Sequence, residues 1–263
     1  MVTYRLIASD LDGTLLGDDG TVSGRTVDAI QAVLCGGATF VFATGRPLRW
    51  VEPIADATGH RGTAVVANGA LVIDLATGVV VDEQLLSVGA ALDAVDRIRA
   101  ALPGVGFAVE RVRDGFAHDH TYTPRWPSPA GTQIAPIGDL LDVAVVKLLV
   151  RHEDRSSNET LAVIRDLLVG VAEPTHSSND GLVEIMALGT SKAAALDRIA
   201  SRLGCWAGDA MVFGDMPNDV DMLRWAGHGV AMANAHPEAR AVADEITLSN
   251  NHDGVAVVLE RLY

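Results

Sequence analysis

Cysteine is scarce in this chain of 263 residues, which contains only Cys35 and Cys205. The two lie far apart and outside any CxxC or Cys/His metal-binding spacing, so the pattern excludes thiol chemistry and indicates a reducing compartment. Long apolar runs are missing as well. The strongest, residues 140–150, is interrupted by Asp142 and Lys147 and is too short to span a bilayer. Because no signal-like apolar segment precedes the first predicted strand, we expect a cytoplasmic protein that does not bind a membrane.

Positive charge is also in short supply, since 20 Lys and Arg residues face 34 Asp and Glu residues and the formal net charge is -14. Nucleic acids and anionic membranes bind clusters of Lys and Arg, so we expect neither as a main partner. An acidic surface is ordinary for a cytosolic protein, but it also repels phosphorylated small molecules. A substrate of that kind therefore needs a local cation or a bound metal ion.

The sequence does contain a regular alternation of apolar strands and amphipathic helices, with 49% hydrophobic and 21% charged residues, as in globular proteins. The strands predicted from apolar runs are 6–8, 38–43, 64–67, 182–187, 210–213, 230–232 and 245–248. Helices are predicted after Ser23 and at 191–203, 218–225, 237–243 and 253–263. This pattern is typical of a parallel sheet covered on both faces. We therefore predict an α/β fold with a doubly wound, mainly parallel, Rossmann-like core sheet.

The alternation is interrupted after a predicted hairpin at 71–81. The following stretch contains helix patterns at 87–101 and 158–169, strand-like runs at 107–112 and 143–150, and a proline-rich segment at 121–136. That segment is a surface loop by default, although a proline-stiffened loop carrying Trp126 can also close over a ligand. The sequence thus predicts a discontinuous core, 1–84 plus 186–263, with 85–185 as an inserted α+β domain.

Two carboxylates follow the first predicted strand, in the stretch Asp10-Leu11-Asp12-Gly13. In an extended chain, residues two apart point the same way, so Asp10 and Asp12 can converge while Leu11 turns into the core. Gly13 lets the chain turn sharply. A plain turn at a strand end explains these residue types as well. Paired carboxylates repel each other, however, so their placement favours a bound cation or a reaction that uses them.

A second acidic cluster, Asp215-Met216-Pro217-Asn218-Asp219, follows another apolar strand. Ligands of open α/β sheets bind at the carboxyl ends of strands, so the two clusters predict an all-oxygen Mg2+ site if their strands are adjacent. Thr44 adds a hydroxyl and the N–H groups of a loop, which suit a phosphate. Lys192 opens a helix, where a cation opposes the helix dipole. Such a lysine is commonly a solvated surface residue, but its unfavourable position indicates a functional reason.

Together these stretches resemble the four motifs of the haloacid dehalogenase superfamily. They are Asp10-Leu11-Asp12-Gly13-Thr14, Thr44-Gly45-Arg46, Lys192 and Gly214-Asp215-Met216-Pro217-Asn218-Asp219, in this order. The insert of about a hundred residues between the second and third motifs resembles the α/β cap of the Cof-type hydrolases and sugar phosphatases. Asn68-Gly69-Ala70 and Asp253-Gly254-Val255 match the same type. The resemblance covers essentially the whole chain, with Ala193 departing from the glycine that commonly follows the lysine.

The resemblance implies a phosphatase that uses Mg2+. Asp10 would attack phosphorus and form an aspartyl-phosphate, with Mg2+ held by Asp10, the backbone carbonyl of Asp12, and Asp215. Asp12 would protonate the leaving alcohol and then deprotonate the attacking water. The groups implied to hold the phosphoryl oxygens are Thr44, Gly45, Lys192 and Asn218. Asp219 would orient Lys192 or a metal-bound water rather than bind the metal directly.

The favoured function is hydrolysis of a small phosphorylated metabolite, such as a sugar phosphate. A phosphomutase or phosphotransferase on the same scaffold is the nearest alternative. A receiver-like module is disfavoured by the insert and by Asp12, whose acid/base chemistry a long-lived phosphoryl switch should avoid. A non-catalytic phosphate-binding module is a further alternative, but nothing is missing from the motif set. Substrate contacts are expected from Arg46 and Asn68, beside the core motifs. Further candidates in the insert are Arg113, His118, His120 and Arg125.

Overall fold

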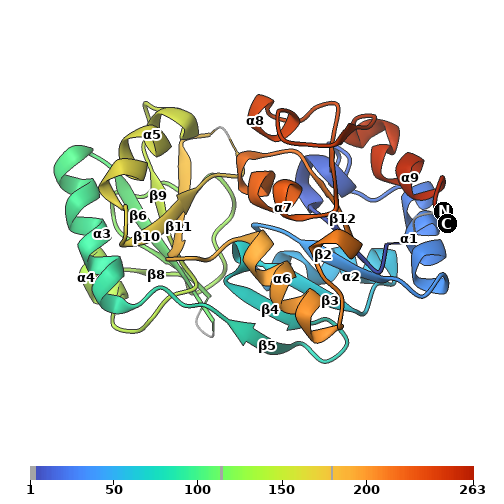
Figure 1. Cartoon of the computed structure of the whole chain (residues 1–263). Helices are drawn as coiled ribbons and strands as arrows, with labels where there is room; N and C mark the ends of the chain where they lie inside the picture. Colours follow the sequence, from blue (N-terminus) through green and yellow to red (C-terminus); the bar gives the residue numbers. More distant parts are fainter. Residues whose placement is uncertain (1–3, 113–114, 179) are drawn as a thin grey trace. The chain divides into compact units, whose positions relative to one another are not determined.

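The computed structural model describes residues 4–112, 115–178 and 180–263 (Figure 1). The chain folds into two compact units: unit 1 comprises Met1–Glu83 and Ser191–Tyr263, and unit 2 comprises Gln84–Thr190. The first boundary lies next to the predicted one at 84. The second, predicted after residue 185, lies after Thr190 instead. That prediction was wrong because strand β11 (Leu182–Ala187) pairs with strands of unit 2, and an apolar run does not reveal which strands it will pair with.

Unit 1 is built on an eight-stranded sheet with the order β14-β13-β12-β1-β2-β3-β4-β5. Its strands are β1 (Leu6–Ser9), β2 (Thr39–Ala43), β3 (Thr63–Val66), β4 (Leu71–Asp74), β5 (Val79–Glu83), β12 (Ala210–Gly214), β13 (His228–Ala231) and β14 (Glu245–Ile246). The pairs from β14 to β3 are parallel, whereas β4 and β5 form an antiparallel hairpin at one edge. The predicted α/β fold with a mainly parallel core sheet is confirmed.

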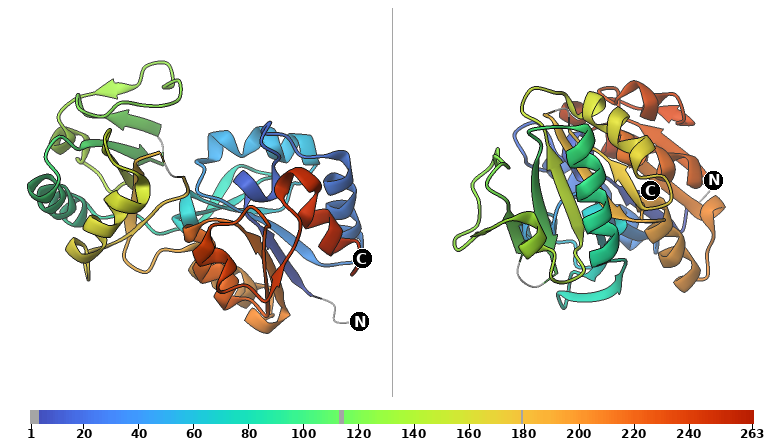
Figure 2. Two further views of the ribbon diagram at one scale, coloured as in Figure 1. Left: turned by 90° about the horizontal axis from the view of Figure 1, so that it is seen from above. Right: turned by 90° about the vertical axis from the view of Figure 1, so that its left-hand side faces the viewer.

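Helices cover both faces of this sheet (Figure 2). On one face α6 packs against α7, and on the other α1 packs against α9. The helices of unit 1 are α1 (Gly24–Cys35), α2 (Glu52–Thr58), α6 (Lys192–Arg202), α7 (Val220–Trp225), α8 (Pro237–Arg240) and α9 (Gly254–Leu259). With helices on both faces, the central strands are buried from both sides, which explains their unbroken apolar sequences.

Unit 2 contains a six-stranded sheet with the order β10-β11-β9-β6-β7-β8. Besides β11, its strands are β6 (Gly106–Arg111), β7 (Gly115–His118), β8 (Gln133–Ile134), β9 (Lys147–Arg151) and β10 (Ala172–Thr175). All described pairs are antiparallel except β7 with β8. Its helices are α3 (Val88–Ala101), α4 (Ile137–Leu140) and α5 (Ser157–Leu167). The insert is therefore an α+β unit.

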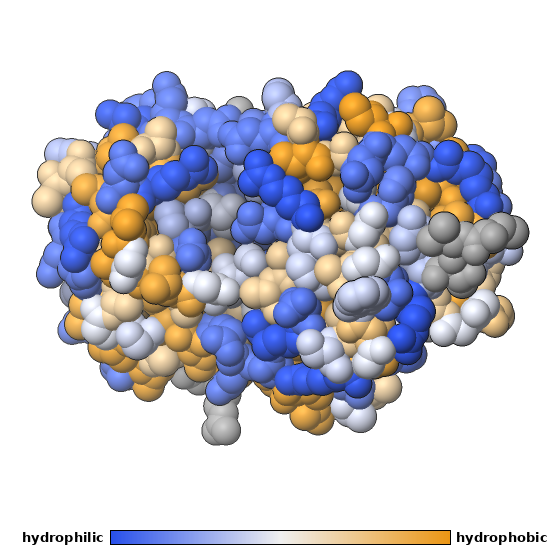
Figure 3. All heavy atoms as spheres, viewed as in Figure 1, coloured by the Kyte–Doolittle hydropathy of each residue, from blue (hydrophilic) through white to orange (hydrophobic). Residues whose placement is uncertain are grey.

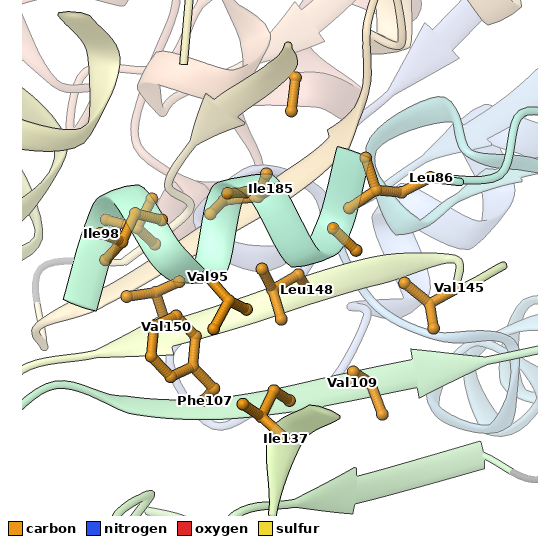
Figure 4. Close-up of a cluster of buried hydrophobic side chains, with 14 of the residues drawn as sticks. Leu86, Val95, Ile98, Phe107, Val109, Ile137, Val145, Leu148, Val150 and Ile185 are labelled. Atoms are coloured by element: carbon orange, nitrogen blue, oxygen red, sulfur yellow. The ribbon is translucent and has the colours of Figure 1, made fainter. Parts of the chain in front are cut away.

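The core of unit 2 lies on one face of its sheet, where alternate strand residues meet the helices. Phe107, Val109, Leu148 and Val150 point toward Val95 and its neighbours on α3 (Figure 4). The intervening residues of the same strands point to the opposite face and include charged side chains. The opposite face also carries a second, smaller apolar cluster, so the residues of the central strands are buried on both faces.

The surface of the chain is mixed in character. On the face seen in Figure 3, hydrophilic and hydrophobic residues lie intermingled, and the described residues form no single broad apolar area. Within the described ranges, no helix combines the length and the hydropathy that a membrane crossing requires. Both cysteines are free thiols.

Candidate active site

Two adjacent strands of unit 1 deliver the acidic clusters to one edge of the sheet. β1 and β12 are parallel neighbours with Ser9 opposite Phe213, and the N–H of Asp10 donates to the carbonyl of Phe213 at 2.9 Å. One carboxylate oxygen each from Asp10, Asp215 and Asp219 lies within 4.8 Å of the others. All three residues are buried. The structure therefore brings together carboxylates that are some two hundred residues apart in sequence.

The turn after β1 fits tightly against the second cluster. Gly13 has φ +72°, and a Cβ built on it would lie 2.4 Å from Oδ2 of Asp215, so only glycine allows this approach. The hydroxyl of Thr14 donates to Oδ1 of Asp215 at 2.9 Å. Asn234 holds the turn from the other side, with its Nδ2 donating to the carbonyl of Gly13 at 2.8 Å. Sequence reasoning assigned no role to Thr14 or Asn234, although Thr14 belongs to the first motif.

Lys192 lies at the centre of the carboxylate cluster. Its side chain is fully buried, and its Nζ donates to Oδ1 of Asp10 at 2.6 Å and to Oδ1 of Asp219 at 2.7 Å. It is therefore not a solvated surface lysine. The second oxygen of Asp219 accepts the backbone N–H groups of Asp215 and Met216, both at 2.9 Å. With both of its oxygens engaged, Asp219 anchors Lys192 and the loop after β12.

The charges in this cluster are out of balance, because it holds three buried carboxylates and one lysine, which pairs with Asp10 and Asp219. Burial raises the pKa of Asp10 well above its usual range, Lys192 opposes that shift, and the carboxylates of Asp219 and Asp215 add to it. Burial and the carboxylate of Asp219 raise the pKa of Asp215 to about 7. Burial alone would lower the pKa of Lys192, but Asp10 and Asp219 outweigh it and raise that pKa. An all-oxygen site with surplus negative charge fits a hard divalent cation such as Mg2+.

Asp12 lies apart from the buried cluster. Its side chain is 53% exposed, and both of its oxygens pair with the guanidinium of Arg46, with Nε to Oδ2 at 2.7 Å and Nη2 to Oδ1 at 2.5 Å. Asp10 and Asp12 leave the strand end in different environments, one buried beside Lys192 and one at the surface beside Arg46. The sequence placed Arg46 near the substrate but did not indicate this ion pair.

The predicted phosphate loop lies at the end of β2, the other neighbour of β1. Thr44 is fully buried, its Oγ1 accepts the N–H of Arg46 at 3.0 Å, and its carbonyl accepts the N–H of Asn68 at 2.9 Å. Gly45 lies between Thr44 and Arg46 in the same loop. Asn68 in turn accepts a hydrogen bond at Oδ1 from Nδ2 of Asn218, at 2.9 Å. Backbone and side-chain bonds thus connect the second and fourth motifs through Asn68.

The candidates in the insert are spread over unit 2. His118 is buried on β7, with Nδ1 2.8 Å from the carbonyl of Asp119. His120 is exposed, and Arg125 makes an exposed ion pair with Glu153 at 3.8 Å. Arg113 lies outside the described residues. The contacts that His118 and Arg125 make are with other residues of unit 2.

Comparison with known proteins identifies the family. The family model of haloacid dehalogenase-like hydrolases matches residues 7–259. The chain belongs to this family. Similar proteins carry phosphatase names, and this chain is a hydrolase that acts on phosphoric monoesters. The resemblance seen in the sequence motifs is confirmed.

Two similar haloacid dehalogenase-like proteins have assigned phosphatase names. The 5-amino-6-(5-phospho-D-ribitylamino)uracil phosphatase YcsE of Bacillus subtilis (strain 168) is 30% identical, and the match covers 97% of this chain and 94% of that protein. The HMP-PP phosphatase of Serratia proteamaculans (strain 568) is 28% identical, with 97% and 93% covered. The solved structure of SMU.1108c from Streptococcus mutans UA159 shares the fold, with a TM-score of 0.86, 23% identity and 98% of each chain covered.

Proposed function

We propose that the protein is a Mg2+-dependent phosphatase that hydrolyses a small phosphomonoester, a sugar phosphate or related metabolite, through an aspartyl-phosphate. The observation that carries this proposal is the position of Asp10, a buried carboxylate at a strand end that is held by Lys192 among surplus negative charge. A buried, ionisable group with a shifted pKa and a specific charged partner is the usual mark of a reacting group.

The residues present fit a divalent cation. Its ligands would be the carboxylates of Asp10 and Asp215 and the backbone carbonyl of Asp12, while Asp219 stays bound to Lys192 and the loop amides. Thr14 and Gly13 hold Asp215 in place for this role. When bound, Mg2+ supplies charge neutralisation between the attacking carboxylate and the phosphoryl group.

The chemistry then divides between two aspartates. An oxygen of Asp10 attacks phosphorus, the P–O bond to the alcohol breaks, and Asp12 gives its proton to the leaving oxygen. In the second half, Asp12 takes a proton from water, the water oxygen attacks phosphorus, and the bond to Asp10 breaks to release phosphate. Charge on the transferring group is met by Lys192, Thr44, the loop N–H of Gly45 and Asn218.

Arg46 has a second role in this scheme. Its fork geometry holds both oxygens of Asp12 and fixes the direction of that carboxylate. Asp12 must leave this pairing in order to exchange a proton with the leaving oxygen, because both of its oxygens accept hydrogen bonds from the guanidinium. A phosphoester dianion that approaches Arg46 competes for the same guanidinium, which gives Arg46 contact with the substrate as well.

The relatives support a small metabolite as substrate. The names of the two phosphatases above specify a phosphorylated ribitylamino-uracil and HMP-PP, both small molecules. Their substrates differ at similar identity to this chain, so the class of substrate is proposed here and not one compound.

The test is a phosphate-release screen over phosphorylated metabolites, with and without Mg2+, comparing the parent with Asp10→Asn. We expect Mg2+-dependent release by the parent and background release by Asp10→Asn, because the amide is a far poorer nucleophile. Asp28→Asn, on the exposed side of α1, is the matched control and should behave as the parent. The proposal fails if no monoester is hydrolysed, or if Asp10→Asn retains turnover.

A further inference from the structure

The turn after β3 has a strained backbone beside the proposed phosphoryl site. Ala67 and Asn68 both have positive φ, 49° and 57°, and the described chain has just one other non-glycine residue of this kind. Asparagine tolerates the left-handed region, but alanine does not do so without cost. Strain of this sort persists where the surroundings enforce it, and it gathers at functional sites.

Neighbouring motifs enforce the turn from two sides. The N–H of Ala67 donates to the carbonyl of Arg46 at 3.0 Å, next to the bond from Asn68 to Thr44. On the other side, a Cβ built on Gly69 would lie 2.2 Å from the carbonyl oxygen of Ser191, the residue before Lys192. The turn is therefore fixed between the Thr44 loop and the start of α6.

The side chain of Asn68 is buried with its hydrogen bonding incomplete. Only 1% of the residue is exposed, and Oδ1 accepts from Nδ2 of Asn218. Among the described residues, Nδ2 of Asn68 has no hydrogen-bond partner, and neither does Oδ1 of Asn218. A buried N–H without a partner is destabilising, so a strained turn that creates one calls for a ligand that accepts from it.

We infer that Asn68 is a phosphoryl-binding residue, whose Nδ2 donates to an oxygen of the transferring group beside Thr44 and Lys192. The assignment rests on the proposed phosphatase function and adds a donor from the β3 turn to the family's four motifs. With Nδ2 of Asn218 donating to Oδ1, the N–H end of the Asn68 amide is the end that lies without a partner among the described residues. Nδ2 of Asn218 already donates one N–H to Asn68, whereas Nδ2 of Asn68 donates to no described residue. Asn68 therefore has more N–H groups available for a ligand than Asn218.

The experiment measures orthovanadate inhibition in Mg2+, with p-nitrophenyl phosphate as substrate, together with thermal unfolding. Asn68→Gly removes the amide and keeps a residue that accepts φ 57° without strain, so the fold should be retained. We expect vanadate inhibition to weaken about 10- to 150-fold, the effect of one lost hydrogen bond to a charged group. Asn68→Asp has the same shape but no donor, and should weaken inhibition at least as much.

Ala67→Gly is the matched control, because it relieves strain in the same turn without touching the amide, and its inhibition should equal that of the parent. Parent-like inhibition in Asn68→Gly would overturn the assignment. Parent-like inhibition in Asn68→Asp would overturn it too, because the Oδ1 anchor for Asn218 would then be the whole contribution. A parent without turnover or vanadate inhibition would instead refute the phosphatase proposal itself.

Discussion

Unit 1 and unit 2 both bury charged side chains, but they balance them differently. In unit 2, Lys147 on β9 pairs with Glu184 on β11, and the Glu184 carboxylate also accepts the hydroxyl of Ser177 at 2.9 Å. In unit 1, Lys192 pairs with Asp10 and Asp219, whereas Asp215, in the same cluster, accepts a hydrogen bond from the hydroxyl of Thr14. Lys147 is thus buried with a carboxylate of opposite charge, whereas Lys192 is buried in a cluster that contains three carboxylates.

The difference separates a structural role from a chemical one. In a matched buried pair each charge is neutralised by its partner, so removing one partner leaves an uncompensated buried charge. A cluster with excess negative charge fits the divalent cation that we propose it binds. The imbalance therefore supports the proposed reacting centre more strongly than burial or the presence of charge, which the two units share.

Removing the cation of unit 1 should have the largest effect. Lys192→Met leaves Asp10 and Asp219 without their shared partner, so we expect turnover of p-nitrophenyl phosphate to fall about 100- to 1,000-fold. The unfolding temperature should fall as well. Adding Asp219→Asn should recover part of the stability and none of the activity. Turnover that survives in Lys192→Met would contradict the role of this lysine in charge neutralisation.

Breaking the matched pair of unit 2 should cost stability instead. Lys147→Met strands the buried carboxylate of Glu184, and we expect a loss of about 3 kcal/mol in the free energy of unfolding of that unit. Hydrogen exchange at the β9 and β11 amides measures this locally. The double variant Lys147→Met with Glu184→Leu should regain most of it. The rise in unfolding temperature caused by Mg2+ should be unchanged in both, and its loss would refute the division between the units.

The pH dependence of stability gives a smaller effect, of a few degrees in the unfolding temperature. Without metal, Asp215 has a folded pKa of about 7 against an ordinary value of 3.8, so between these pH values the folded protein retains a proton that the unfolded chain has released. Stability relative to Asp215→Asn should therefore fall as pH rises through this window. Mg2+ binds the ionised carboxylate, so its stabilising effect should grow over the same range.

Thermal unfolding at pH 5.5 and pH 8, in EDTA and in excess Mg2+, tests this. Asp215→Asn, which cannot ionise, should match or exceed the metal-free parent at the higher pH and should lose most of the response to Mg2+. If the metal-free parent gains stability relative to this variant as pH rises, ionisation of the buried Asp215 does not destabilise the folded protein, and the prediction is wrong.

Much of unit 1 was predictable because its signals are local. Continuous apolar runs mark β1 and β12, and the polar residues that follow them must meet at one edge of a parallel sheet. The unfavourable helix position of Lys192 likewise indicated a functional residue. Pairing partners are not local: the apolar run of β11 suits either sheet, and it was assigned to the wrong unit.

The finer features of the site depend on side-chain directions that spacing does not encode. Arg46 and Asp12 are 34 positions apart, and their pairing depends on how two loops leave neighbouring strands. The incomplete hydrogen bonding of Asn68 depends on a left-handed backbone at an asparagine, which sequence permits but does not require. Asn68 was expected near the substrate, but its unpaired donor could be seen only in three dimensions.

The order of β1 and β12 in the chain has a consequence for biosynthesis. β1 ends at Ser9, whereas its neighbour β12 begins at Ala210, so a ribosome adding about 5–20 residues per second makes them roughly 10–40 seconds apart. Unit 2 is continuous in sequence and is complete before α6 and β12 emerge. During this interval Asp10 lacks both Lys192 and Asp219. The proposed catalytic centre is thus among the last parts of the nascent chain to assemble, and a chain truncated before residue 191 has five of the eight strands of the sheet and lacks Lys192, Asp215 and Asp219.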